Sequence, residues 1–175
     1  GAQMACGMRA APGAIEGVVI SPTAVSCKVI GDEKPVGICG SGLIDVIAQL
    51  YLAGLTDENG KLVDRETALQ SVSEAVADRL TSNGNNKVFV LATAEETGGA
   101  PIFISQRDIR ELQYAKGAMA SGIKILERAL GIGDDQIEQV MLAGSFGSYI
   151  NPASARAIGL VPPVPLERIA AVGNT

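Results

Sequence analysis

The segment Ile137–Ala143 is a mainly apolar run that ends at Gly144-Ser145-Phe146-Gly147. Apolar residues on successive positions are typical of a strand that is covered on both faces. Ligands of open α/β sheets bind beyond the carboxyl ends of such strands. The segment therefore predicts a buried strand leading into a glycine turn, which we interpret as part of a nucleotide pocket.

The longest predicted helix lies directly before this strand. Ser105-x-x-Asp108 resembles a capping box, apolar residues keep helical spacing over 109–130, and Gly131 ends the helix. Gly117 and Gly122 lie inside it, at a cost of about 1 kcal/mol each relative to alanine. We expect a close packing partner, or a ligand near the backbone, to offset this cost.

A second helix is predicted after Gly40-Ser41-Gly42, because apolar residues recur with helical spacing from Leu43 to Tyr51. Ser41 is the expected N-cap, Asp45 suits the positive start of the helix, and Gly54 can close it. The remaining predicted elements are strands over 14–20, 25–30, 87–93, 101–104 and 169–172, a helix over 65–80 capped by Asp64, and a short helix starting at Asn151-Pro152. This order predicts one α/β domain over 1–175, with a mixed sheet and helices packed against it.

Composition excludes several classes of protein. The net charge is −5 and the 14 Lys and Arg residues are scattered, so no basic stripe is available to nucleic acid. No apolar run is long enough to cross a bilayer, so we expect a cytoplasmic protein that does not bind membranes. Histidine is absent and the three cysteines are widely spaced, which disfavours a zinc site, an imidazole-based triad or a disulfide framework.

Two glycine turns are candidate ligand sites. Gly40-Ser41-Gly42 opens a helix, where backbone amides favour an anion, and Gly144-Ser145-Phe146-Gly147 ends a buried strand. The alternative interpretation is that both are ordinary tight connections. Neither turn matches a dinucleotide-binding fingerprint or a P-loop.

Single residues leave further alternatives open. Lys116 is a candidate to flank a base or a phosphate, or is a solvated helix lysine. Arg9 is a candidate for a phosphate or partner contact, or is a surface arginine. Asp45 and Asp108 are better explained as helix caps than as catalysts. Cys39 is either a reactive thiol or a small buried apolar side chain.

Five blocks together resemble the C-terminal part of the reductive activators of corrinoid proteins. The blocks are Cys6–Glu16 (CGMRAAPGAIE), Gly37–Asp45 (GICGSGLID), Gln106–Gly117 (QRDIRELQYAKG), Leu142–Tyr149 (LAGSFGSY), and Gly159–Pro162 with Val172–Asn174. These activators are iron–sulfur proteins with an actin-like ATPase module of the RNase-H-like fold. The resemblance implies that ATP drives reduction of inactive cob(II)alamin on a corrinoid protein or corrinoid-dependent methyltransferase.

The resemblance also implies functional residues. Gly144, Ser145, Phe146 and Gly147 match the adenosine-side turn of actin-like ATPases. Gln113 and Lys116 lie on the helix that flanks the adenine, and the triplet Gly40, Ser41 and Gly42 matches a glycine turn near the cleft. ATP with Mg²⁺ is the implied cofactor of the intact protein.

Two features of the family are missing from this chain: the phosphate-binding hairpin and the cysteines of the [2Fe–2S] domain. We therefore expect a fragment, the second half of an ATPase module, that is inactive alone, exposes an apolar face and has the remaining half of its own module as a partner. Two alternatives are a protein-interaction or regulatory module with an actin-like fold and a relative of small-molecule kinases.

Overall fold

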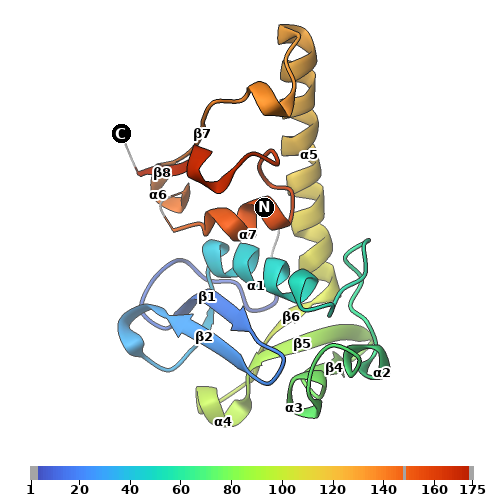
Figure 1. The fold of residues 1–175 in the computed structure, drawn as a ribbon. Coiled ribbons are helices and arrows are strands. Elements are labelled where there is room, and N and C mark those ends of the chain that lie inside the picture. Colours follow the sequence, from blue (N-terminus) through green and yellow to red (C-terminus); the bar gives the residue numbers. More distant parts are fainter. Residues whose placement is uncertain (1–3, 148, 174–175) are drawn as a thin grey trace.

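The computed structural model describes residues 4–147 and 149–173. Figure 1 shows them arranged along one long helix, α5 (Gln106–Leu130), with two small sheets at its lower end and a third sheet beside its upper half. The mixed α/β class is therefore confirmed. The expected single sheet is not, because the strands form three separate sheets within the described residues.

The first sheet has the strand order β2-β1-β3. The predicted hairpin is present as β1 (Ala14–Ile20) and β2 (Val25–Val29), which pair antiparallel. A short helical turn, η1 (Ile30–Asp32), then leads to β3 (Gly37–Ile38), which pairs with β1 in parallel. β1 is therefore the central strand of a small mixed sheet.

The second sheet is antiparallel, with the order β4-β5-β6. β4 (Leu80–Asn83) and β5 (Asn86–Ala92) form a hairpin closed by Gly84 and Asn85, and Gly84 has a φ of +59° that suits this tight turn. α4 (Ala94–Thr97) connects β5 to β6 (Ile102–Ser105). The two strands predicted over 87–93 and 101–104 are confirmed.

The helix predicted over 65–80 is wrong. The segment forms two single-turn helices, α2 (Arg65–Ala68) and α3 (Glu74–Ala77), and its last residues begin β4. The break comes from a tertiary contact, because the amide of Ser73 donates to the carbonyl of Pro22 at 2.7 Å. The apolar spacing still places Val76 in the core.

Helix-end signals were predicted more reliably. Asp64 accepts from the amide of Thr67 at 2.8 Å, and Ser105 and Asp108 form the capping box of α5. Gly131 ends α5 in the left-handed conformation, and Asn151 caps α7 (Pro152–Ala157). These signals need only neighbouring residues, which is why the sequence reveals them.

Helix α1 (Gly40–Leu52) starts earlier than predicted. Its N-cap is Cys39, so Ser41 lies inside the first turn and the prediction that Ser41 caps the helix is wrong. The cause is the strand below, because the amide of Cys39 donates to the carbonyl of Ile15 while the carbonyl of Cys39 accepts from the amide of Leu43.

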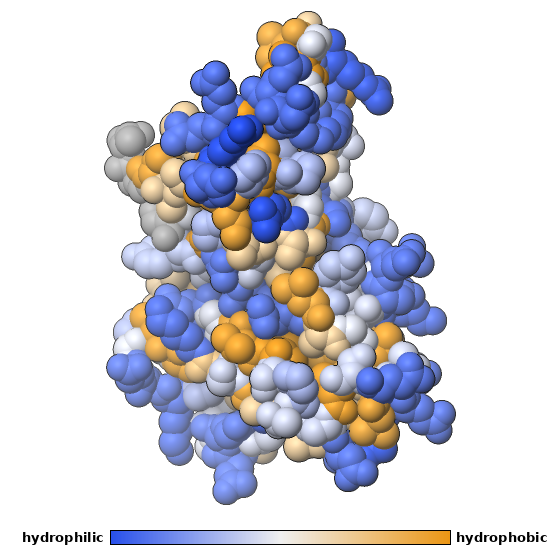
Figure 2. Space-filling view, viewed as in Figure 1, coloured by the Kyte–Doolittle hydropathy of each residue, from blue (hydrophilic) through white to orange (hydrophobic). Residues whose placement is uncertain are grey.

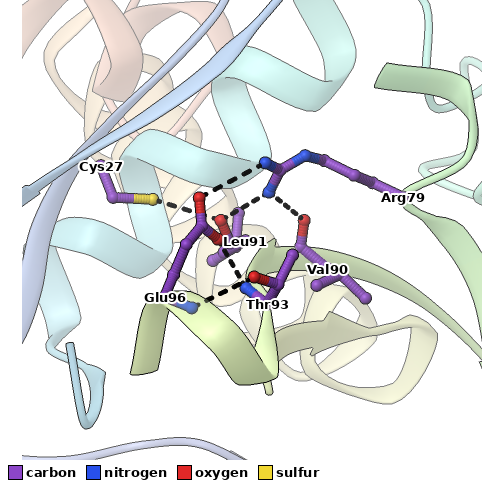
Figure 3. A network of polar contacts seen from close by, with 6 residues as sticks. All are labelled: Cys27, Arg79, Val90, Leu91, Thr93 and Glu96. Carbon is purple, nitrogen blue, oxygen red and sulfur yellow. Dashed lines mark hydrogen bonds and ion pairs between the residues drawn. The ribbon is translucent and has the colours of Figure 1, made fainter. Parts of the chain in front are cut away.

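A polar network joins the two lower sheets (Figure 3). The guanidinium of Arg79 donates to the carbonyls of Val90 and Leu91 at 3.2 and 2.8 Å and lies 3.8 Å from the carboxylate of Glu96. The thiol of Cys27 on β2 donates to the same Leu91 carbonyl at 3.7 Å. Burial raises the pKa of this thiol to about 11, so Cys27 is a protonated donor at neutral pH.

The third sheet contains β7 (Val140–Ala143) and β8 (Ile169–Gly173), which are parallel. β7 is shorter than predicted and is not covered on both faces, because Met141 is 63% exposed. The shorter elements around it are η2 (Asp134–Gln136), α6 (Gly144–Gly147) and η3 (Leu166–Arg168).

One hydrophobic cluster runs from the lower sheets through α1 and α7 to β8, and it includes Ile15, Leu50, Phe89, Ala155 and Ile169. The outer face of α5 is left out of this core. Its exposed large side chains are Tyr114, Met119, Ile125, Leu126 and Leu130, and Figure 2 shows hydrophobic surface at the tip of α5.

This outer face of α5 bears out the expected exposed apolar face. A Cβ at Gly117 or Gly122 would meet no atom within 4 Å, so the described part of the chain supplies no close partner to offset their helical cost. Among the residues that the structure describes, no helix is long and apolar enough to span a membrane.

Candidate nucleotide site

A cleft of about 310 Å³ lies beside the lower half of α5. Its walls come from α1, from the loop between α1 and α2, from α5 and from the end of α7. The residues that define its chemistry are Tyr51, Asp57, Glu58, Gln113, Lys116 and Arg156, over an apolar base of Ile47, Ile109, Leu112 and Ile158. An apolar cleft with a few polar groups is the usual form of a small-molecule site.

Helix α5 places Gln113 and Lys116 on the same wall, because residues three apart lie on one face of a helix. The amide Nε2 of Gln113 donates to the carbonyl of Asn59 at 2.8 Å. Gln106, two turns earlier, accepts from the amide of Leu62 at 2.7 Å and donates to the carbonyl of Gly60 at 2.9 Å. The two glutamines therefore hold the loop 57–62 against α5 and shape one side of the cleft.

Lys116 faces the chain reversal after α7. Its ammonium lies 3.9 Å from the position that a Cβ on Gly159 would occupy, and Gly159 has a φ of +69°. Lys116 is half-buried, and it forms no ion pair with the residues that the structure describes. Asp57 and Glu58 line the same cleft, so it presents both a cation and acceptor groups to a ligand.

The second predicted part of the site is the turn at the carboxyl end of β7. Gly144 has a φ of +86°, and a Cβ there would meet no atom within 4 Å, so a ligand can approach this backbone closely. Gly147 differs, because a Cβ on it would lie 2.6 Å from the carbonyl group of Leu142. The side chains of Ser145 and Phe146 lie outside what the structure describes.

The two parts do not share one cavity in this chain. Neither Gly144 nor Gly147 is among the described residues that line the cleft beside Gln113 and Lys116. The structure thus brings Gln113 and Lys116 together with Gly159. The glycine turn at the end of β7 lies outside this cleft. Their joint role in binding one nucleotide stays a prediction.

The turn Gly40-Ser41-Gly42 has a packing role. A Cβ on Gly42 would lie 2.2 Å from the carbonyl oxygen of Ile15, and Ser41 is only 4% exposed. The thiol of Cys39 is buried and lies 3.3 Å from the Ile15 carbonyl and 3.2 Å from the hydroxyl of Ser41. This supports the interpretation of Cys39 as a small buried side chain, and none of the triplet lines the cleft on α5.

The other candidate residues have varied outcomes. Arg9 is exposed, and Asp108 is the cap that was predicted. Asp45 is not a cap, because the first turn of α1 contains no acidic residue and Asp45 instead bonds to β1 and α7. The sequence did not predict Arg156 as a residue of the cleft. The only available signal was its position shortly after the Asn151-Pro152 helix start, which places it near the end of α7.

Metal and cluster chemistry does not fit the described residues. No three His, Cys, Asp or Glu side chains among them gather in a way that could hold a metal ion. Cys27 and Cys39 bond to different backbone carbonyls, those of Leu91 and Ile15.

Comparison with known proteins shows the family and the fold. The chain is 36% identical over 176 residues to the corrinoid activation enzyme RamQ of Eubacterium limosum, which covers 99% of this chain and 29% of that protein. A solved structure of a reductive activator for a corrinoid, iron–sulfur protein matches with a TM-score of 0.83 and 38% identity, over 95% of this chain and 26% of that chain. This chain thus spans less than a third of either relative.

The fold is that of the actin-like class of domains. More narrowly, the chain belongs to the family described as the C-terminal domain of RACo, the ASKHA domain, whose sequence model matches residues 1–175.

Proposed function

We propose that this chain is the nucleotide-binding part of an ATP-dependent activator, which drives reduction of an inactive corrinoid on a partner protein. The observation that carries the proposal is the cleft on α5, where Gln113 lies beside Lys116 and the turn at Gly159. Lys116 forms no ion pair with the residues that the structure describes. The relatives support the proposal, because they are named as activators in corrinoid systems.

The residues of the cleft suit a nucleotide chemically. The amide of Gln113 can both donate to and accept from a base edge, and the ammonium of Lys116 can meet a base or a phosphate. The backbone at Gly144, where a Cβ would meet no atom within 4 Å, would approach the adenosine from the end of β7. Closure around ATP would then favour one arrangement of the module, and hydrolysis would release it.

The electron and the phosphate-binding groups would come from outside this chain. In the proposed cycle, a [2Fe–2S] domain outside this chain would supply one electron to cob(II)alamin on the partner, which would become cob(I)alamin. ATP binding or hydrolysis would drive this unfavourable transfer. The corrinoid protein or corrinoid-dependent methyltransferase is the proposed partner. Mg²⁺ and the phosphates would be held by the other half of the ATPase module.

That other half is also the proposed occupant of two open surfaces. β7 pairs with β8 on one side and, within the described residues, with no strand on the other. A parallel pair of strands is normally part of a larger covered sheet. The exposed outer face of α5, with Ile125 and Leu126 each more than 60% exposed, provides a second apolar surface for the same module to cover.

ATP titration of the full-length protein tests the proposed site. We expect Lys116→Gln and Gly144→Val each to weaken ATP binding by about tenfold or more, which is about 1.4 kcal/mol of binding free energy. Arg128→Gln is the matched control, because Arg128 is an exposed cation on the same helix outside the cleft. Unchanged ATP affinity in both site variants would rule out the assignment.

Activity assays separate the proposed function from the alternatives. The full-length protein with its corrinoid partner should reduce cob(II)alamin only when ATP is present. Phosphotransfer from ATP to a small molecule would instead favour a kinase relative, and ATP-independent partner binding would favour an interaction module. The isolated chain 1–175 is expected to show no ATP hydrolysis.

A further inference from the structure

Asp45 is a buried carboxylate whose oxygens accept hydrogen bonds from two distant parts of the chain. Its Oδ2 accepts from the amide of Val18 on β1 at 2.7 Å. Its Oδ1 accepts from the side-chain amide of Asn151 at 3.3 Å and from the hydroxyl of Ser154. Asp45 is 7% exposed, and a carboxylate at that depth is tolerated only when such donors satisfy it.

The position of α7 depends on this carboxylate. A helix of six residues is too short to be stable by itself, so tertiary contacts must fix it. Asn151 has two roles, because its Oδ1 accepts from the amide of Ala153 at 3.0 Å while its Nδ2 donates to Asp45. The hydroxyl of Ser154 then attaches the first turn of α7 to the same carboxylate.

The attachment continues from α7 back to the glycine turn. Ile150 is buried in the core, and its amide donates to the carbonyl of Gly147 at 3.4 Å. Gly147 itself is fitted closely against Leu142 at the end of β7. Gly147 is therefore held by the strand, while Asn151 and Ser154 are held by Asp45.

We propose that Asp45 is a positioning residue of the nucleotide site, which fixes the segment behind Gly144–Gly147 so that this turn keeps a set orientation toward bound ATP. The inference rests on the proposed function, because only a ligand-binding turn needs this orientation for affinity. A turn held in its binding geometry loses less free energy when the ligand orders it.

The test uses the full-length protein and the variants Asp45→Ala and Asp45→Asn. We expect Asp45→Ala to weaken ATP binding about tenfold. Asp45→Asn should recover part of the affinity, because the amide can still accept from Val18 while it donates to Ser154. Hydrogen exchange should accelerate over 149–157 in Asp45→Ala more than over β4, β5 and β6.

Arg79→Gln is the matched control. Arg79 is also the centre of a partly buried polar network, but its partners lie in the lower sheets and not on α7. We expect Arg79→Gln to lower the free energy of unfolding while leaving ATP affinity and the exchange of 149–157 unchanged. A merely structural role for Asp45 would make the two variants behave alike, which would overturn the proposal.

The outcomes separate the two proposals. Failure of the wild-type protein to bind ATP would refute the proposed function. Binding by the wild type together with unchanged affinity in folded Asp45→Ala would refute the positioning role alone. If Asp45→Ala does not fold, the variant Ser154→Ala provides the test, because it removes one of the donors to Asp45. It should weaken ATP binding about threefold and accelerate hydrogen exchange over 149–157. Unchanged ATP affinity in Ser154→Ala would also refute the positioning role.

Discussion

The α-carbon of Gly42 approaches the carbonyl oxygen of Ile15 so closely that a Cβ on Gly42 would lie 2.2 Å from that oxygen. The contact brings the start of α1 directly over β1. Because the obstacle is backbone and not a flexible side chain, the strand and the helix would have to separate to admit any other residue.

We therefore predict that Gly42→Ala destabilises the chain by about 1–3 kcal/mol, the range for overpacked interior positions. Urea unfolding followed by circular dichroism measures this. A variant as stable as the wild type would show that α1 and β1 can separate without cost.

Gly122→Ala should have the opposite effect. Gly122 lies on α5, where a Cβ would meet no atom within 4 Å. Alanine is favoured over glycine in a helix by up to about 1 kcal/mol, so the chain 1–175 should become more stable in the same unfolding experiment. If the full-length protein is destabilised instead, another segment packs against this position, as the sequence predicts.

Cys27 should make stability fall in alkaline solution. Burial raises the pKa of its thiol to about 11 in the folded chain, whereas an unfolded thiol titrates near 8.5. Between these values the unfolded state loses a proton that the folded state keeps, so rising pH favours unfolding. The difference in unfolding free energy between the wild type and Cys27→Ala should shrink from pH 8 to pH 11; a constant difference would contradict the burial of this thiol.

The ion pairs of Lys124 should make the free energy of unfolding decrease in acid. The ammonium of Lys124 lies 2.7 Å from the carboxylate of Asp134 and 2.8 Å from that of Glu127. The hydrogen bond from Lys124 to Asp134 lowers the pKa of Asp134. A lowered folded pKa gives stability that is present above about pH 4 and is lost as pH falls through the folded value. Asp64 also has a lowered pKa, so Lys124→Met should reduce the fall in the urea midpoint between pH 6 and pH 3 without abolishing it. An equal fall in both proteins would assign the acid response to other carboxylates.

The sequence was most informative where structure depends on adjacent residues. Ser105, Asp108 and Asn151 cap their helices with side chains that reach backbone amides only two or three residues away. The helix predicted over 65–80 failed because a distant carbonyl, that of Pro22, holds Ser73 and turns the chain. Local spacing contains no information about such a contact.

The candidate site shows the same division. Gln113 and Lys116 lie on one wall because they are three residues apart on a helix, which the sequence alone predicts. Gly159 lies near Lys116 because the chain turns back toward α5 after α7, and the sequence does not predict this tertiary contact. Asp45 looked like a helix-start residue, and its bonds to Asn151 and Ser154, more than a hundred positions away, could not be anticipated.

The open side of β7 has a practical consequence for work with the separate chain. Within the described residues, β7 has a neighbouring strand on one side only. An unpaired strand edge is a template for another strand, and Met141 adds an exposed apolar side chain beside it. Copies of the 175-residue chain in solution are therefore expected to associate through this edge as concentration rises. Such association would come from the unpaired edge of β7 in the separate chain, so the oligomeric state should be measured on the full-length protein.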